Sequence, residues 1–264
     1  MIKTKERELK QIYAMVVIVF LVFLLIPIVL LLGKSFEGGG GVSLEHYADV
    51  AGGKGFAAAF GRSIFVSCVS AVLTTALAFV LAYTIHYTNV PGGLKKFIRL
   101  AAVVPMLLPT ITYGFAIIYS FGRQGFITGM IGHQMFEIYG FYGLLLGYVI
   151  YTLPISFMLI LNTMSFIDKK FMIVSRIMGD SPLKTFLGTV IRPLLGTLAA
   201  SFVQCFFLCF TDFGIPASVG GQYDVVATVL YNEMLGSVPD FNRGAVVAMF
   251  MLVPSVVSIS LLHF

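Results

Sequence analysis

Six long apolar segments limit what this chain can fold into. Each is 16 to 24 residues long, and about 20 apolar residues suffice to cross the hydrocarbon core of a bilayer as a helix. The segments cover residues 12–32, 63–86, 100–121, 140–162, 196–211 and 244–264. Backbone groups in lipid must be satisfied within the segment or within a closed barrel, and these lengths suit helices. The sequence therefore predicts an all-α membrane protein, a bundle of six transmembrane helices.

The composition excludes a water-soluble globular domain. Of the 264 residues, 58% are hydrophobic and only 11% are charged, whereas soluble domains carry about 25% charged residues. Mean hydropathy is +0.96. Cys68, Cys205 and Cys209 lie inside apolar segments without metal-ligand spacing, so we expect neither disulfides nor a metal site. No nucleic-acid-binding motif is present, and the net charge of +5 is better explained by membrane topology.

The distribution of charge orients the predicted helices. With the N-terminus in the cytoplasm, residues 1–11, 87–99 and 165–195 lie on that side and hold twelve of the 17 lysines and arginines. Eight of the 12 acidic residues fall on the other side. Positive charge is concentrated in the cytoplasmic loops of membrane proteins. We therefore expect a cytoplasmic N-terminal segment, 1–11, followed by a multi-pass membrane domain, 12–264.

Two polar stretches interrupt the apolar segments. Residues 33–62 contain two glycine-rich runs and are expected to form a flexible linker. Residues 165–195 carry five basic and two acidic side chains, with apolar residues recurring at helical spacing. This second stretch is expected to form short amphipathic helices. Its composition fits docking onto a partner protein and fits an interfacial helix on lipid headgroups equally well.

A few residues in the apolar segments are candidates for a solute pathway. Pro105 and Pro109 interrupt the third segment and free backbone carbonyls, which either pack against neighbouring helices or face a wet cavity. Gln204, Thr211 and Asp212 are polar residues of the fifth segment and its end. A carboxylate in a membrane is a functional candidate, but the position of Asp212 favours capping of the Gly- and Pro-rich turn that follows it.

Residues 165–195 also contain a motif. Asp168 opens the stretch, the triplet Ile173-Val174-Ser175 is followed four residues later by Gly179, and Pro193 comes fourteen residues after that glycine. This pattern resembles the cytoplasmic loop of permease subunits in ABC importers fed by an extracytoplasmic binding protein. In that family an EAA triplet precedes the glycine. Here the acid of the triplet is absent, and Arg192 stands where the family has leucine before the proline.

The resemblance extends along most of the chain. Gly61-Arg62-Ser63 looks like the start of the family's second span, and Pro91-Gly92 like the end of it. The runs at residues 211–221 and 245–255 are similar to a subgroup that includes ferric-iron, thiamine and aminoethylphosphonate permeases. Members of this subgroup often fuse two such halves in one polypeptide. Because no cationic anchor follows the last apolar segment, we expect this chain to be the N-terminal half of a longer protein.

The resemblance implies a type I, MetI-like fold in which the loop forms a coupling helix that inserts into a groove of the ATPase subunit. The loop residues expected to contribute are Asp168, Phe171, Ile173, Val174, Ser175, Arg176, Gly179, Asp180, Phe186 and Pro193. The implied partners are an ABC ATPase dimer, an extracytoplasmic solute-binding protein, a second permease half or chain, and the lipid bilayer of the bacterial cytoplasmic membrane. The implied cargo is ferric iron, a phosphonate or a similar small ion or metabolite.

The sequence itself favours a non-catalytic transport subunit. It contains no Walker motif and no DxD or HExxH site, so ATP would be bound by a separate subunit and this chain would bind no cofactor. The alternative is an ion- or proton-coupled secondary transporter. Such a transporter more often carries ionisable residues at the membrane midplane, and these apolar segments have none there.

Overall fold

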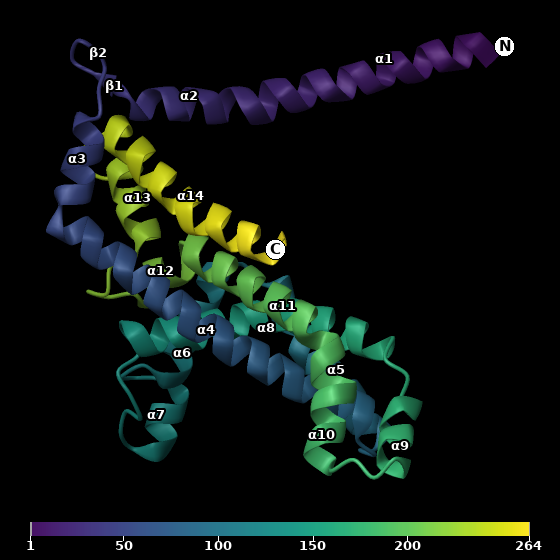
Figure 1. The fold of residues 1–264 in the computed structure, drawn as a ribbon. Helices are drawn as coiled ribbons and strands as arrows, with labels where there is room; N and C mark the ends of the chain where they lie inside the picture. Colours follow the sequence, from purple (N-terminus) through teal and green to yellow (C-terminus); the bar gives the residue numbers. More distant parts are fainter. Residues whose placement is uncertain (1, 264) are drawn as a thin grey trace. The chain divides into compact units, whose positions relative to one another are not determined.

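A computed structural model describes residues 2–263, with side-chain surroundings for residues 8–258 and residue 260. The expected all-α membrane class is confirmed: apart from one short hairpin, the regular structure of the described residues is helical (Figure 1). The chain divides into two units, Met1–Phe56 with Leu230–Val253 and Ala57–Val229 with Pro254–Phe264. Parts of the predicted segments 1–11 and 244–264, namely Met1 and Phe264, lie outside the described residues.

The elements follow one another along the chain as labelled in Figure 1. They are α1 (Ile2–Phe20), the π-helical turn η1 (Leu21–Leu25), α2 (Ile26–Ser35), β1 (Glu37–Gly38), β2 (Gly41–Val42), α3 (Glu45–Gly52), α4 (Lys54–Tyr87), α5 (Gly92–Val103), the 3₁₀ turn η2 (Val104–Leu107), α6 (Thr110–Phe121), α7 (Phe126–Ile131), α8 (Phe141–Ser165), α9 (Lys170–Ile177), α10 (Pro182–Phe186), the π-helical turn η3 (Leu187–Ile191), α11 (Arg192–Thr211), α12 (Gly214–Val219), α13 (Val226–Leu235) and α14 (Phe241–His263).

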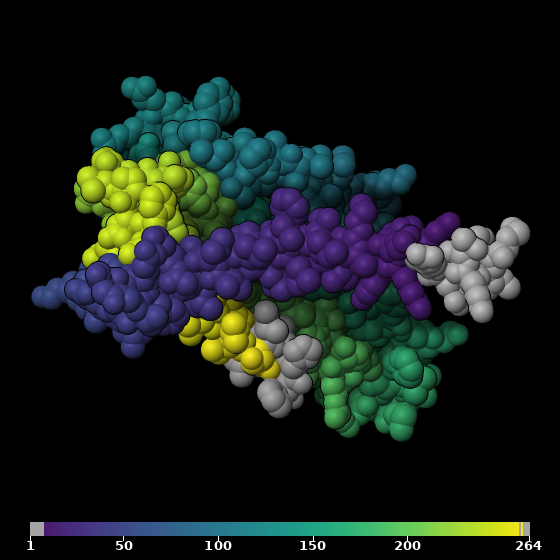
Figure 2. All heavy atoms as spheres, turned by 90° about the horizontal axis from the view of Figure 1, so that it is seen from above, coloured from purple at the N-terminus to yellow at the C-terminus, as the bar shows by residue number. Residues whose placement is uncertain are grey.

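Five helices are long and apolar enough to cross a membrane, and a bent pair can supply a sixth span. The five are Glu8–Ser35, Lys54–Tyr87, Phe141–Ser165, Pro182–Thr211 and Phe241–Ser258, and the pair is Gly92–Leu107 with Thr110–Ile131, bent by 113°. In the first of these helices the apolar side chains of the described part are exposed along its length (Figure 2). Exposure of this kind suits contact with lipid tails or with another membrane helix.

Residues 33–62 differ from the expected flexible linker. They contain the end of α2, the β1–β2 hairpin, α3 and the first residues of α4. Aromatic packing orders the segment, because Phe36 stacks on Tyr47 with ring centroids 5.2 Å apart and Tyr47 meets Phe250 at 6.0 Å. The Tyr47 hydroxyl also shares a 2.9 Å hydrogen bond with Ser35 Oγ. The glycine-rich composition concealed these long-range contacts, which offset the entropy lost on ordering the segment.

The third apolar segment is broken where its prolines stand. The chain leaves η2 at Leu108 and begins α6 after Pro109, which is the position of the 113° bend. The Tyr113 hydroxyl reaches back and donates to the carbonyls of Pro105 and, at 3.2 Å, of Leu108. The Pro105 carbonyl also accepts from Leu108 N at 3.0 Å, so both carbonyls are paired within the protein, as in the packed alternative of the two that the prolines allowed.

Small polar residues join the long helices of the second unit. Thr74 of α4 and Thr152 of α8 share a 3.0 Å hydrogen bond, and both are buried. Ser201 of α11 lies within hydrogen-bond distance of Ser156 of α8 and 3.3 Å from Thr75 of α4. Small side chains let membrane helices approach closely, and their hydroxyls then find partners across the interface.

Glycines let α12 pack tightly against α6 and α8. A Cβ placed on Gly114 would come within 1.6 Å of Ser218 Oγ, and one on Gly147 within 2.7 Å of Ile215 Cγ2. On α12 itself, a Cβ on Gly214 would lie 2.2 Å from Thr110 Oγ1. The turn after α11 is thus held against the broken third segment by contacts that admit no larger residue.

This close approach predicts a difference between two glycine substitutions. Gly114→Ala forces a clash with Ser218 and should destabilise the protein by about 1–3 kcal/mol, the usual cost of overpacking. Gly129→Ala in α7 should be tolerated, because nothing lies within 4 Å of the added methyl group. Thermal unfolding of both variants in detergent checks this, and equal midpoints would contradict the packing described here.

Candidate functional site

Residues 165–195 are organised differently from the predicted run of short amphipathic helices. Only α9 and the turn after it stand apart from the long helices, because Pro182–Thr211 is continuous and long enough to span a membrane (Figure 1). Pro193 lies at the start of α11 without ending the helix. It has no backbone N–H to donate, and the helix runs on through the π-helical turn η3 immediately before it.

Gly179 makes the turn that ends α9. Its φ of +84° lies in the left-handed region, where residues with a Cβ are disfavoured. Gly179 N donates to the Arg176 carbonyl at 3.0 Å, and Asp180 N donates to the Ser175 carbonyl at 3.1 Å. Together these bonds form a Schellman motif, the C-terminal cap that the glycine's position allowed.

A polar brace holds the angle between α9 and α10. Ser175 Oγ donates to Asp180 Oδ2 at 2.8 Å and lies 2.9 Å from Thr185 Oγ1. Lys184 Nζ is 2.5 Å from Asp180 Oδ1. The hydrogen bond from Lys184, then that from Ser175, lowers the pKa of the Asp180 carboxyl. Thr185, which is buried, was not among the predicted site residues. No local sequence pattern shows that a threonine in the next helix faces Ser175.

The outer face of α9 is apolar and uncovered. Phe171, Ile173 and Val174, all expected site residues, are more than half exposed. Ile177 and Met178 at the end of the helix are more exposed still, at 79% and 78%. A contiguous apolar surface of this kind marks an interaction site, because it is costly to leave in water.

Phe186 and Asp168, two other expected site residues, have structural roles. Phe186 is half-buried and faces inward, with its ring 5.7 Å from Tyr83 and 6.2 Å from Phe79 of α4. It therefore fastens the stretch to a membrane helix and does not belong to the exposed face. Asp168 caps α9, since its Oδ1 accepts from Lys170 N at 2.9 Å.

A pocket beside α9 brings several expected residues together. Its volume is about 440 Å³, and its lining includes Asp168 and Phe171 from the start of α9 and Pro193 from the start of α11. The Arg176 side chain is exposed on α9 and does not line this pocket. The structure thus gathers most of the predicted coupling residues within one compact end of the second unit.

The five candidate pathway residues do not form one site. Asp212 is buried, and its Oδ2 accepts from Ile215 N at 2.9 Å, the capping arrangement that the sequence allowed. Thr211 donates to the Phe207 carbonyl at 2.8 Å, and the Pro105 carbonyl is taken by Tyr113. Of the five, only Gln204 lines the larger polar cavity beside α4, α5, α8 and α11, a space of about 700 Å³.

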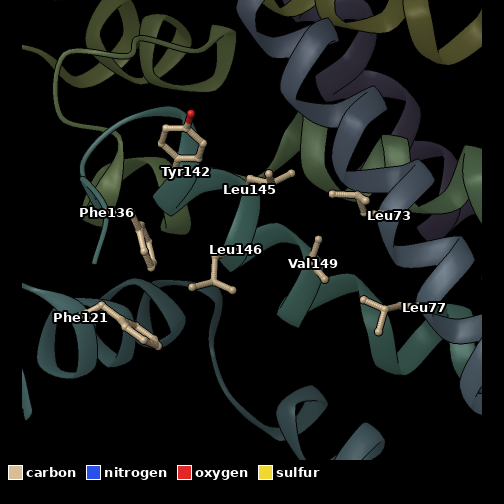
Figure 3. Close-up of a pocket in the computed structure, with 8 residues that line it drawn as sticks. All are labelled: Leu73, Leu77, Phe121, Phe136, Tyr142, Leu145, Leu146 and Val149. Atoms are coloured by element: carbon tan, nitrogen blue, oxygen red, sulfur yellow. The ribbon is translucent and has the colours of Figure 1, made fainter. Parts of the chain in front are cut away.

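A second cavity in the same unit is almost wholly apolar. It has a volume of about 420 Å³. Its lining comes from α4, α8 and the end of α6, together with Phe136 of the loop between α7 and α8. Figure 3 shows the Tyr142 hydroxyl as the one side-chain oxygen among the eight labelled residues. Such a lining suits lipid tails or a neighbouring helix better than a polar solute.

Within the described residues, no group of three or more His, Cys, Asp or Glu side chains could hold a metal ion.

The brace predicts how the turn responds to substitution and to pH. Asp180→Asn removes the ion pair with Lys184 and should speed amide hydrogen exchange in residues 175–185. Because the folded-state pKa of Asp180 is lowered, its stabilisation is present above the ordinary value of 3.8 and lost as the pH falls through the lowered value. The difference from the parent protein should therefore be constant across neutral pH.

Arg176→Gln is the control for that measurement. Its side chain belongs to the same helix but makes no polar contact among the residues described here, so exchange in residues 175–185 should stay unchanged. Equal effects of Asp180→Asn and Arg176→Gln would show that charge, and not the brace, orders the turn.

No protein-family model matches the chain. Individual proteins do. The chain is 25% identical over 245 residues to the ferric transport system permease protein FbpB of Actinobacillus pleuropneumoniae, an alignment covering 90% of this chain and 35% of the relative. It is 28% identical over 197 residues to the thiamine transport system permease protein ThiP of Salmonella typhimurium, covering 72% of this chain and 36% of that protein. The chain thus spans about a third of the length of these relatives.

Solved structures share the fold. A bacterial ABC transporter that imports the acidic polysaccharide alginate superposes with a TM-score of 0.82 at 14% identity, covering 99% of this chain and 97% of its own. The MetNI methionine ABC transporter in an inward-facing conformation gives a TM-score of 0.55 at 12% identity, covering 80% of this chain and 98% of that chain. The resemblance read from the sequence is therefore confirmed: the chain is similar in sequence to permease proteins of transport systems, and it shares the membrane fold of solved ABC transporters.

Proposed function

We propose that the chain is the membrane-spanning permease part of an ATP-driven ABC importer. The observation that carries this proposal is the exposed apolar face of α9, which is held rigidly to the membrane helices and has nothing covering it in the described chain. An interfacial helix on lipid headgroups would use such a face as well. The closed turn at Gly179 and the brace at Asp180 favour docking, because a helix resting on lipid needs no fixed angle to its neighbour.

Under this proposal α9 inserts into a groove of the ATPase subunit and transmits its motion to the membrane helices. Two connections make α9 a lever. The brace of Ser175 and Thr185 ties α9 to α10, which continues without interruption into α11. Phe186 ties the same region to Phe79 and Tyr83 of α4. Movement of α9 would therefore shift two long helices together, as alternating access requires.

The partners follow from the same proposal. ATP hydrolysis belongs to a separate subunit, since this sequence contains no nucleotide-binding motif. A second permease half would complete the pathway, and the fact that FbpB is about three times as long as the matched region supports such a half. The alginate transporter has been solved with a ligand-bound periplasmic protein, which supports delivery by an extracytoplasmic binding protein here.

The orientation and cargo complete the proposal. The α9 end faces the cytoplasm of a bacterial inner membrane, as the excess of lysine and arginine in residues 1–11, 87–99 and 165–195 predicts. The cargo is a small solute. Relatives named for ferric iron, thiamine and sulfate support a small ion or metabolite without choosing among them.

Docking through α9 predicts loss of the ATPase on charge insertion. Ile177→Asp with Met178→Asp places two carboxylates on the most exposed apolar positions of α9. Interface hot spots contribute 2 kcal/mol or more, so the retained ATPase should fall at least about thirtyfold when the complex is purified through this chain. Val238→Asp, equally exposed but in the other unit, is the matched control. Full retention of the ATPase by the double variant would refute the docking proposal.

A rigid lever predicts a second, separable effect. Gly179→Val places a β-branched side chain at a φ of +84°, which costs about 1–2 kcal/mol, and should uncouple ATP hydrolysis from transport while the helices still insert. Gly93→Val adds the same side chain at a glycine with nothing within 4 Å and without a positive φ. The ratio of ATP hydrolysed to solute moved should rise in the first variant only. An unchanged ratio would mean that the turn does not transmit motion.

A further inference from the structure

The polar cavity beside α4, α5, α8 and α11 is lined with positive charge. Lys95 and Arg99 of α5 and Lys169 at the start of α9 reach it from two separate segments of the chain. None of its twelve described lining residues is acidic. Asp168, the acid next to Lys169 in sequence, lines the other pocket, beside Pro193.

Two of the three cations are held in place without being neutralised. Lys95 Nζ donates to the Thr88 carbonyl at 2.9 Å. Lys169 Nζ lies 5.9 Å from the centre of the Tyr87 ring, a cation–π distance. A carbonyl and an aromatic ring fix these side chains but leave their full charge directed at the cavity, in contrast to Lys184, which is paired with Asp180.

The part of the cavity wall that long helices contribute carries two amide side chains among apolar ones. Asn162 of α8 and Gln204 of α11 line it and are exposed, and their amide groups have no hydrogen-bond partner among the described residues. An unpaired amide in hydrocarbon costs several kcal/mol. This face is therefore suited to water or a polar solute, and a lipid-filled cavity would leave both amides unsatisfied.

We propose that this cavity is a water-filled vestibule of the solute pathway and that its charge selects anionic solutes, such as carboxylates, phosphates or sulfates. The inference rests on the proposed transport function and adds the charge class of the cargo. A cleft lined by one sign of charge focuses its field and raises the local concentration of counter-ions by about tenfold or more. An anion leaving the membrane would be held at this mouth, whereas a cation would be repelled.

The test compares two thiol reagents of similar size and opposite charge, the sulfonate MTSES and the trimethylammonium MTSET. The parent is a variant with Cys68, Cys205 and Cys209 replaced by alanine, in nanodiscs that leave both faces accessible. If that parent does not fold, the native cysteines are kept and their labelling is subtracted. Ser165→Cys places the reactive thiol in the cavity, and Ser181→Cys places one outside it, between Asp180 and Lys184. The ratio of MTSES to MTSET rates should be about tenfold higher at position 165.

Matched charge removals identify the source of the preference. In the Ser165→Cys background, Lys95→Gln, Arg99→Gln and Lys169→Gln should each lower the ratio several-fold, and the triple variant should bring it to the value at position 181. Lys96→Gln removes the neighbouring lysine, which does not line the cavity, and should leave the ratio within about twofold. Equal ratios at positions 165 and 181, or equal effects of Lys95→Gln and Lys96→Gln, would overturn the proposal.

Two lipid compositions distinguish a solute from a headgroup, which carries the same phosphate chemistry. The preference for MTSES should be the same in nanodiscs of phosphatidylcholine alone and in nanodiscs that also contain phosphatidylglycerol. A preference that disappears with phosphatidylglycerol would mean that anionic lipid fills the cavity, and the pathway role would then be wrong. Neither ATPase nor cargo is present in these measurements. Absence of the charge preference would therefore leave the permease proposal unaffected. That proposal is tested separately, by whether the variant with Ile177→Asp and Met178→Asp still retains the ATPase.

Discussion

Polar groups inside a bilayer cannot form hydrogen bonds with water, and the helix contacts of this chain reflect that constraint. At the bend before α6, the Tyr113 hydroxyl reaches the carbonyls of Pro105 and Leu108, and the Pro105 carbonyl also accepts from Leu108 N. Hydroxyl groups also pair between α4, α8 and α11, as Thr74 and Thr152 do. Close packing makes both solutions possible, because hydroxyls reach across an interface only where small residues let the backbones approach.

The helix α9 is fixed at one end of the second unit by specific contacts. Its outer apolar face is left uncovered by the described chain, so burial of that face does not orient the helix. Its orientation is fixed instead by the glycine turn, by the hydrogen bonds of Ser175, and by Phe186 packed on α4. These contacts leave the apolar face free for a partner while connecting it to two long helices.

The apolar cavity and the polar cavity differ in the environment that they suit. The cavity lined by Tyr142 offers almost nothing but hydrocarbon, which is typical of a surface that meets lipid or another helix. The cavity lined by Gln204 and three cations offers amides and positive charge, which are costly against lipid and favourable against water or an anion. In our proposal, side-chain chemistry thus separates a surface that faces the membrane from a surface that faces the solute pathway.

The sequence by itself determined the class of fold and the local geometry of the turn. Apolar runs of membrane length need no tertiary information to predict helices, and Gly179 could be assigned to a left-handed turn because only its own backbone is involved. The bend at Pro109 was signalled by its prolines, although the angle was not. The order within residues 33–62, the inward position of Phe186 and the partnership of Ser175 with Thr185 could not be foreseen. Each depends on which faces of distant segments meet.

The basic cavity shows the same division most clearly. Lys95, Arg99 and Lys169 were visible in the sequence only as markers of topology, since each stands in a loop expected to be rich in positive charge. Tertiary structure decided that residues some seventy positions apart line one space together with Gln204. The charge of a loop can be counted from the sequence. The charge that lines a cavity depends on how four helices pack against one another.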